Sequence, residues 1–225
     1  MHRVGLIIPS SNVVVEDTLR QQAGGMNPAV AFHIARFSVV AVDLGGDSVD
    51  QFQDAAIDRA IDQLMEADVD RIIFAGTAGA WLGIDRERAW CRRATDRADL
   101  PVTSTTLMAL EALRKASAAR IGLITPFRTD VHEAIVQNFA GEGFATKVSH
   151  CLELDRSRDM ADVSPKRIAD LVRSCLDEGC DTVLCFCTNF RGLDACKQIS
   201  TVNPSATLLD SVGLTLHVAG ADFRN

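Results

Sequence analysis

The chain has 225 residues, of which 47% are hydrophobic and 24% are charged, and its net charge is −7 at neutral pH. This length suits one large domain or two domains of about 110 residues. The acidic balance argues against nucleic acid as a partner, and the short apolar run at the N-terminus argues against a signal peptide or a membrane anchor. The seven cysteines, in a chain without an export signal, favour free thiols. We therefore expect a cytoplasmic protein that binds neither membrane nor nucleic acid.

Short apolar runs alternate with segments of helical period along the whole chain. The apolar runs predict strands at residues 3–9, 30–39, 70–76, 100–103, 120–125, 145–153, 181–187 and 206–210. The amphipathic segments predict helices at residues 13–23, 50–67, 84–97, 105–117, 129–141, 164–178, 191–200 and 212–221. Strands that alternate with helices in this way predict parallel sheets covered by helices on both faces.

Two segments of the first half of the chain reappear in the second half. Arg3–Pro9 returns almost unchanged as Arg120–Pro126, and Asp70–Ala78 is echoed by Asp181–Asn189. The repeat predicts an α/β fold of two similar halves, each a mostly parallel sheet flanked by helices. We expect a pseudo-twofold duplication with the functional site between the halves. The expected ranges are 1–104 with the C-terminal segment 205–225 for the first half, and 105–204 for the second.

The two copies of the repeat differ at one reactive position. Gly76 in the first copy stands where the second copy has Cys187. Cys187 falls at the end of a predicted strand, and the N-terminus of the following helix would lower the pKa of its thiol. A thiol of this kind can act as an acid or as a nucleophile. The alternative is a small buried hydrophobic residue, which is our interpretation of the other six cysteines.

The loops that follow the predicted strands are rich in hydroxyl groups, amides and small residues, and they contain few carboxylates. In parallel sheets, ligands bind beyond the carboxyl ends of the strands, and the free N–H groups at helix N-termini attract anions. We therefore expect an anion site without a metal, since no histidine or cysteine spacing matches a zinc site. Helix capping alone would also explain any single loop. The loops are residues 9–12, 75–79, 103–106, 126–129, 187–189 and 210–211.

These motifs resemble the aspartate/glutamate racemase superfamily, and within it the branch of maleate isomerase and arylmalonate decarboxylase. The opening Gly5–Asn12, with Glu16 beyond it, is similar to the opening of maleate isomerase. Cys187–Asn189 is similar to the second cysteine motif of the superfamily. Gly76 followed by Thr77 is similar to arylmalonate decarboxylase, which keeps only the second cysteine. The resemblance spans nearly the whole chain and implies two α/β halves with the site between them.

The resemblance also implies an enzyme that forms an enediolate beside a carboxylate without a metal or cofactor. Cys187 would protonate this intermediate, while Thr77, Thr188 and nearby backbone N–H groups would stabilise its charge. We expect these three residues to be catalytic. The residues expected to bind the substrate are Ser10, Ser11, Asn12, Gly76, Ala78, Phe127 and Asn189.

Two positions depart from the pattern of the branch. Phe127 replaces a tyrosine that donates to a substrate carboxylate, and the region of Ser157 replaces an asparagine of the isomerase. Because Gly76 cannot supply a second thiol, we favour decarboxylation of a substituted malonate. The alternatives are a cis–trans isomerase of maleate type and a non-catalytic protein that binds small carboxylates. The expected partner is a small carboxylate in every case, and a homo-oligomer is compatible with each.

Overall fold

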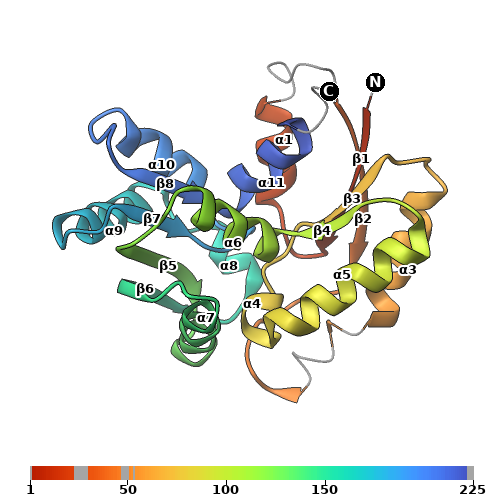
Figure 1. The fold of residues 1–225 in the computed structure, drawn as a ribbon, viewed down its shortest axis with the longest axis horizontal. Helices are drawn as coiled ribbons and strands as arrows, with labels where there is room; N and C mark the ends of the chain where they lie inside the picture. The colour runs from red at the N-terminus through yellow and green to blue at the C-terminus, as the bar shows by residue number, and fades with distance from the viewer. Residues whose placement is uncertain (1, 23–29, 47–50, 53, 222–225) are drawn as a thin grey trace.

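The computed structural model describes residues 2–22, 30–46, 51–52 and 54–221 (Figure 1). Its strands are β1 (His2–Pro9), β2 (Val30–Phe37), β3 (Arg71–Phe74), β4 (Val102–Ser104), β5 (Ile121–Phe127), β6 (Thr146–Leu154), β7 (Thr182–Cys185) and β8 (Thr207–Asp210). Its helices are α1 (Val14–Gln22), α3 (Asp54–Met65), α4 (Gly79–Leu82), α5 (Ile84–Ala98), α6 (Thr105–Lys115), α7 (Thr129–Gly141), α8 (Ser157–Ala161), α9 (Pro165–Asp177), α10 (Gly192–Ser200) and α11 (Ser211–Ala221).

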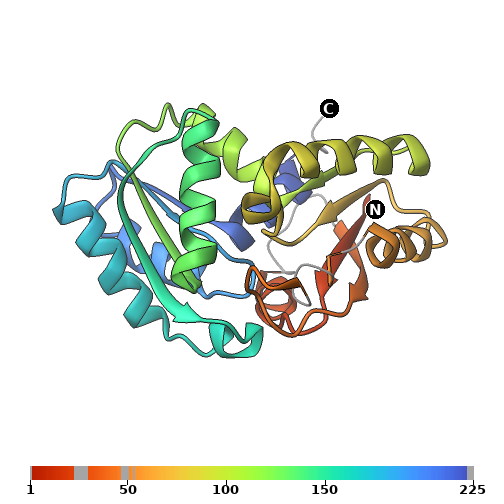
Figure 2. The ribbon, with the colours of Figure 1, turned by 90° about the horizontal axis from the view of Figure 1, so that it is seen from below.

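The strands form two parallel sheets that repeat one another. The first sheet has the order β2-β1-β3-β4 and the second has the order β6-β5-β7-β8. Thus β1 pairs with β2 and β3 in the first sheet, as β5 pairs with β6 and β7 in the second. Helices flank both sheets, and the two halves lie side by side (Figures 1 and 2). The structure confirms the predicted α/β fold of two similar halves.

Each predicted strand and helix has a counterpart in the structure, although several ends differ. β3 and β7 end at Phe74 and Cys185, so Gly76 and Cys187 lie in loops beyond the strands. The short helices α4 and α8 were not predicted, because four or five residues are too few to show a helical period. Residues 23, 50 and 53 of the predicted helices, and residues 222–225, lie outside the described part of the chain.

The central strand of each sheet is buried on both faces. Val4 to Ile8 of β1 are buried, and so is every residue of β5. Near-continuous apolar strands of this kind are typical of parallel sheets with helices on both sides, which is why their repeat stands out in the sequence. None of the helices in the described ranges combines the length and the apolar character that a membrane span needs.

The last helix returns to the first half of the molecule. Val212 and Leu216 of α11 share a buried cluster with Leu6 of β1, and the hydroxyl oxygens of Thr105 and Thr215 lie 3.0 Å apart. By contrast, β8 pairs with β7 in the second sheet. We therefore propose that the C-terminal segment crosses to the first half after β8, rather than before it.

Candidate active site

A cavity of about 410 Å³, partly open to solvent, lies between the two halves. The loops that follow β1, β3 and β7 and the last residue of β5 contribute to its wall, as expected for parallel sheets. Its polar lining comes from Asn12, Thr77, Ser157, Cys187, Thr188 and Asn189. The remaining lining comes from Pro9, Val39, Val42, Phe52, Gly76, Ala78, Trp81, Phe127 and Met160. Eight of the ten residues expected from the sequence as catalytic or substrate-binding therefore meet in one place.

Asn12 links the two halves at this cavity. Its side-chain oxygen accepts a hydrogen bond from the backbone N–H of Val15 (3.2 Å) and so caps α1. Its Nδ2 donates to the hydroxyl of Thr188 in the other half (3.1 Å), and that hydroxyl donates to the carbonyl of Ala75 (3.0 Å). The hydroxyl proton of Thr188 is thus already donated to Ala75. In this arrangement Thr188 holds together the loops that follow β1, β3 and β7. Its expected role as a charge-stabilising donor would need the hydroxyl to turn.

Both polar atoms of the Asn189 side chain are hydrogen-bonded within the protein. Its Oδ1 accepts from the backbone N–H of Val13 (3.0 Å), and its Nδ2 donates to the carbonyl of Ser157 (2.6 Å). These contacts hold the start of α1 and the start of α8 against the loop after β7. Asn189 lines the cavity, but its polar atoms support the wall instead of facing a substrate, which differs from the expected binding role.

Neither Ser10 nor Ser11 lines the cavity. The hydroxyl of Ser10 accepts from the backbone N–H of Val39 (3.1 Å). The hydroxyl of Ser11 is buried without a hydrogen-bond partner. In the tight turn in which Asn12 N–H donates to the carbonyl of Pro9 (3.0 Å), only the side chain of the third residue of this loop hydrogen-bonds to the other half. Neither serine therefore contributes to the cavity wall, and their expected substrate contacts stay a prediction.

Cys187 is buried, and burial raises the pKa of its thiol to about 12. The backbone N–H of Asn189 lies 3.4 Å from Sγ and works weakly in the opposite direction, whereas the carboxyl of Asp210 raises the pKa further. The expectation of a lowered pKa is wrong, because α10 begins only at Gly192 and its N-terminus does not adjoin the thiol. A thiol of this pKa is protonated at neutral pH and suits proton donation better than nucleophilic attack.

Gly76 faces the same cavity from the loop after β3. Among the described glycines, those with positive φ are Gly83, Gly143 and Gly179, so the backbone of Gly76 does not itself demand glycine. A Cβ atom at residue 76 would instead come within 2.9 Å of the Phe74 ring. Glycine is therefore favoured here by the packing behind the loop.

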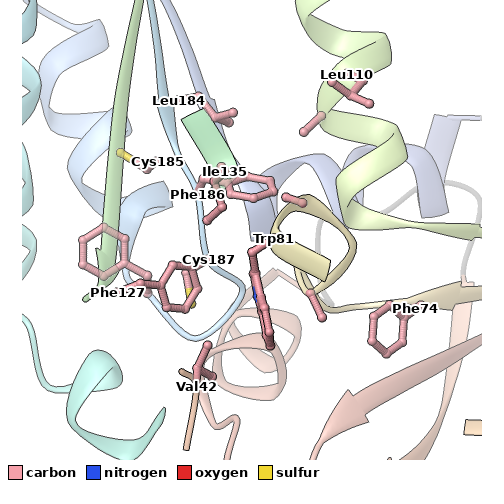
Figure 3. Close-up of a cluster of buried hydrophobic side chains, with 14 of the residues drawn as sticks. Val42, Phe74, Trp81, Leu110, Phe127, Ile135, Leu184, Cys185, Phe186 and Cys187 are labelled. Atoms are coloured by element: carbon pink, nitrogen blue, oxygen red, sulfur yellow. The ribbon is translucent and has the colours of Figure 1, made fainter. Parts of the chain in front are cut away.

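Apart from Ala78 and Phe127, the apolar part of the wall was not found from the sequence. Phe127 is 2% exposed, and the rings of Trp81 and Phe52 meet edge to face with centroids 5.3 Å apart. Figure 3 shows Val42, Trp81 and Phe127 gathered around Cys187. Such residues look like ordinary core residues in a sequence. The one available signal was Trp81, which directly follows the run of small residues 75–80.

A match to protein families decides the classification. The family model for arylmalonate decarboxylase matches residues 4–212. The chain belongs to the arylmalonate decarboxylase family. This confirms the resemblance drawn from the motifs at residues 5–12 and 187–189.

Maleate isomerases and an arylmalonate decarboxylase match this chain over nearly its full length. A maleate isomerase of Pseudomonas putida is 25% identical over 226 residues, covering 96% of this chain and 89% of that protein. The fold of a maleate isomerase variant from Pseudomonas putida S16 with maleate matches with a TM-score of 0.86 at 19% identity, covering 96% and 90% of the two chains. A doubly substituted arylmalonate decarboxylase in the liganded form matches with a TM-score of 0.84 at 19% identity, covering 100% and 94%. The chain is thus an isomerase or a decarboxylase of this family.

Proposed function

We propose that this family member is a cofactor-independent decarboxylase that acts on a substituted malonate and protonates an enediolate with Cys187. The observation that carries the proposal is the single buried thiol of raised pKa on one side of the cavity, with Gly76 on another part of its wall. A neutral thiol can give a proton once, and nothing in the loop of Gly76 can remove one. Loss of CO2 followed by one protonation needs one proton donor and no second group that removes a proton.

The proposed reaction has two steps. The bond between the α-carbon and one carboxylate breaks, CO2 leaves, and the electron pair remains as an enediolate on the other carboxylate. The thiol of Cys187 then transfers its proton to the α-carbon, and the resulting thiolate regains a proton from water. The hydroxyl of Thr77 and the N–H groups of its loop would stabilise the negative charge of the enediolate. Asn12, fixed by its contacts to α1 and Thr188, would orient the retained carboxylate.

The apolar wall supports loss of CO2. An ionised carboxylate among apolar side chains loses its hydration, whereas the neutral CO2 that it becomes loses little. Val39, Val42, Phe127 and Met160 line the cavity, and none of their side chains offers a hydrogen-bond donor for an anion. A carboxylate held beside them is therefore destabilised relative to the product, and the same wall accepts an aryl or alkyl substituent.

A maleate-type isomerase is the second candidate. The match to the maleate isomerase of Pseudomonas putida over 96% of this chain favours it, as does the loop that carries Asn12. A solved cysteine-to-serine variant of the maleate cis-trans isomerase of Nocardia farcinica carries a covalently bound succinylcysteine intermediate. A covalent route of this kind needs a nucleophilic thiolate. Here Cys187 would have to supply it, and its raised pKa works against that.

Product analysis distinguishes the candidates. We expect CO2 release from 2-aryl-2-methylmalonates, and proton NMR should show the matching monocarboxylic acid. Maleate should remain unchanged under the same conditions. Conversion of maleate to fumarate without CO2 release from any malonate would contradict the proposal and favour the isomerase. Calorimetric binding of malonates without any turnover would identify a non-catalytic binder.

Turnover should survive exhaustive chelation. The polar lining of the cavity offers hydroxyl groups, amides and one thiol, but no carboxylate or imidazole. Among the described residues there is also no group of three or more histidine, cysteine or acidic side chains arranged to hold a metal. We expect the same kcat before and after dialysis against EDTA, with metal content checked by mass spectrometry. Activity that is lost on chelation and restored by a divalent ion would contradict the cofactor-free mechanism.

Phe127→Tyr should tighten binding of a dicarboxylate. The new hydroxyl would enter the cavity and donate to a carboxylate, a charge-assisted hydrogen bond of about 1.5–3 kcal/mol. This corresponds to a roughly tenfold or greater fall in Kd, measured by calorimetry with a malonate. The monoester of the same acid serves as the control ligand and should gain less. An unchanged or weaker affinity for the diacid would mean that Phe127 faces an apolar part of the ligand.

A further inference from the structure

An arginine of the first half holds the loop that leads to Asn12. Arg36 lies on β2, the strand that pairs with the outer side of β1. Its Nη1 donates to the carbonyl of Ser10 (2.9 Å) and to the carbonyl of Asn12 (3.2 Å), and the carbonyl of Pro9 lies 3.4 Å from the same nitrogen. Because this nitrogen carries two N–H groups, at least one of them is shared between carbonyls. One end of Arg36 thus gathers three carbonyls of a single loop.

The other terminal nitrogen of Arg36 binds an acid of α1. Nη2 donates to the carboxylate of Glu16 in an ion pair. The two side chains are 34% and 27% exposed, so solvent screens this pair only in part. Glu16 lies in the first turn of α1, where a carboxylate also interacts favourably with the helix dipole. Arg36 therefore ties β2 both to the loop after β1 and to the helix that follows this loop.

Asn12 lies where this loop, α1 and the active-site cavity meet. Its Oδ1 accepts from the backbone N–H of Val15, and its Nδ2 donates to the hydroxyl of Thr188. Both contacts depend on the position of the Asn12 backbone, whose carbonyl is held by Arg36. A shift of this backbone would turn the amide away from Thr188 and from a ligand in the cavity. Arg36 itself does not line the cavity, so its effect on a ligand passes through the loop.

The planar guanidinium group suits this double contact. Its two terminal nitrogens have fixed directions in one plane, so one can serve a carboxylate while the other serves main-chain carbonyls. A lysine at residue 36 would present one ammonium nitrogen on a flexible stem, which can serve either Glu16 or the loop. A methionine would keep an apolar stem of similar length and serve neither. Substitution by lysine and by methionine therefore removes the contacts in two steps.

The second half holds its equivalent loop in a similar way. β6 pairs with β5 as β2 pairs with β1. Glu153 of β6 accepts hydrogen bonds from the backbone N–H (3.2 Å) and from the hydroxyl of Thr129, which lies just beyond β5. In both halves, a charged residue of the edge strand thus binds the chain that leaves the central strand. The first half uses a cation on carbonyls, and the second uses an anion on donors.

We propose that Arg36 is a positioning residue, which fixes the backbone of residues 9–12 so that the side-chain amide of Asn12 is held at the cavity between the halves. The catalytic consequence rests on the proposed function, in which Asn12 orients the retained carboxylate. The placement of the amide does not rest on it and can be measured without turnover.

Nitrogen–proton NMR follows the amide of Asn12 directly. Its two side-chain N–H signals are identified as the pair that is missing from Asn12→Ala. We expect both signals to move in Arg36→Met, and to move less in Arg36→Lys. Arg20→Met is the matched control and should leave them in place, because Arg20 also pairs with an acid of α1, Asp17 (3.5 Å), but its side chain is 77% exposed.

A double-mutant cycle measures whether Arg36 acts through Asn12. We expect Arg36→Met to lower kcat/KM for a 2-aryl-2-methylmalonate by about tenfold or more, since a misplacement of about 1 Å can cost about a hundredfold. Arg36→Lys should lower it by less. In the Asn12→Ala background, Arg36→Met should change kcat/KM by less than about twofold. A residue that contributes only to stability would give the same factor in both backgrounds.

Circular dichroism and Tm establish that the variants fold. If Arg36→Met does not fold, Arg36→Lys is carried through the same spectra and the same cycle. Asn12 signals that stay in place in the folded Arg36 variants, or an equal loss of kcat/KM with and without the Asn12 side chain, would overturn the inference. Failure to find turnover on any malonate, with the Asn12 signals displaced in the Arg36 variants, would overturn the proposed function alone.

Discussion

Cys187→Ser should lower kcat by at least about a hundredfold, because a positioned general acid contributes about 10²–10⁴ to rate and a serine hydroxyl is a far weaker acid than a thiol. The fold should survive the change. Serine is slightly smaller than cysteine, and its oxygen can accept the hydrogen bond that Asn189 N–H now gives to Sγ at 3.4 Å. Steady-state kinetics with a 2-aryl-2-methylmalonate measure kcat, and calorimetry with an unreactive malonate checks that the affinity is unchanged.

Cys185→Ser provides the matched control two positions away. Cys185 is buried at the end of β7 and its thiol is hydrogen-bonded to Cys196. It does not line the cavity, so most of the activity should remain. If the Cys187 variant keeps more than about a tenth of the wild-type rate, which corresponds to roughly 1.4 kcal/mol of barrier, Cys187 is not the proton donor.

Gly76→Cys should add a new reaction to the enzyme. The repeat relates residue 76 to Cys187, and both line the same cavity. A thiolate on one side of a substrate and a thiol on the other can remove the α-proton and return it to the opposite face. We expect the variant to exchange the α-hydrogen of chiral 2-aryl carboxylic acids with deuterium from D2O, and to racemise them, at rates well above those of the wild type.

The cost of this substitution lies in the packing behind residue 76. The new Cβ atom would approach the Phe74 ring to 2.9 Å, and that ring packs against Phe37 and Trp90 with centroids 5.7 Å away in each case. Overpacking of this kind costs about 1–3 kcal/mol of stability, visible as a lower Tm. Gly76→Ser carries nearly the same steric cost without a thiol and should show no exchange. A folded Gly76→Cys variant without exchange above the wild-type level would show that residues 76 and 187 do not face one substrate.

The sequence was most informative about the sheets. The repeat of Arg3–Pro9 at Arg120–Pro126 predicted two equivalent central strands, because strands buried on both faces must be apolar along their length. The loops of Thr77 and Cys187 followed from the same pattern, since both come after strands of equivalent position. The strand ends were less well predicted, because Ala75 and Phe186 are apolar and buried although they lie beyond β3 and β7.

The direction of each loop side chain could not be predicted from the sequence. Ser10, Ser11 and Asn12 are equally polar neighbours, yet only the side chain of Asn12 hydrogen-bonds to the other half, because the turn after Pro9 sets which side chain points there. The pKa of Cys187 was mispredicted for a related reason. A raised pKa depends on how deeply the thiol is buried, and burial is a property of contacts between the two halves.

The most direct test of the account is the isotope content of the product formed in D2O. Wild-type enzyme incubated with a 2-aryl-2-methylmalonate should release one CO2 per turnover and place one deuterium at the α-carbon of a single product enantiomer, because only the thiol of Cys187 delivers the proton. Proton NMR and chiral chromatography measure both quantities. A racemic product, an α-carbon without deuterium, or fumarate formed from maleate while the malonate stays intact would contradict the single-cysteine decarboxylase.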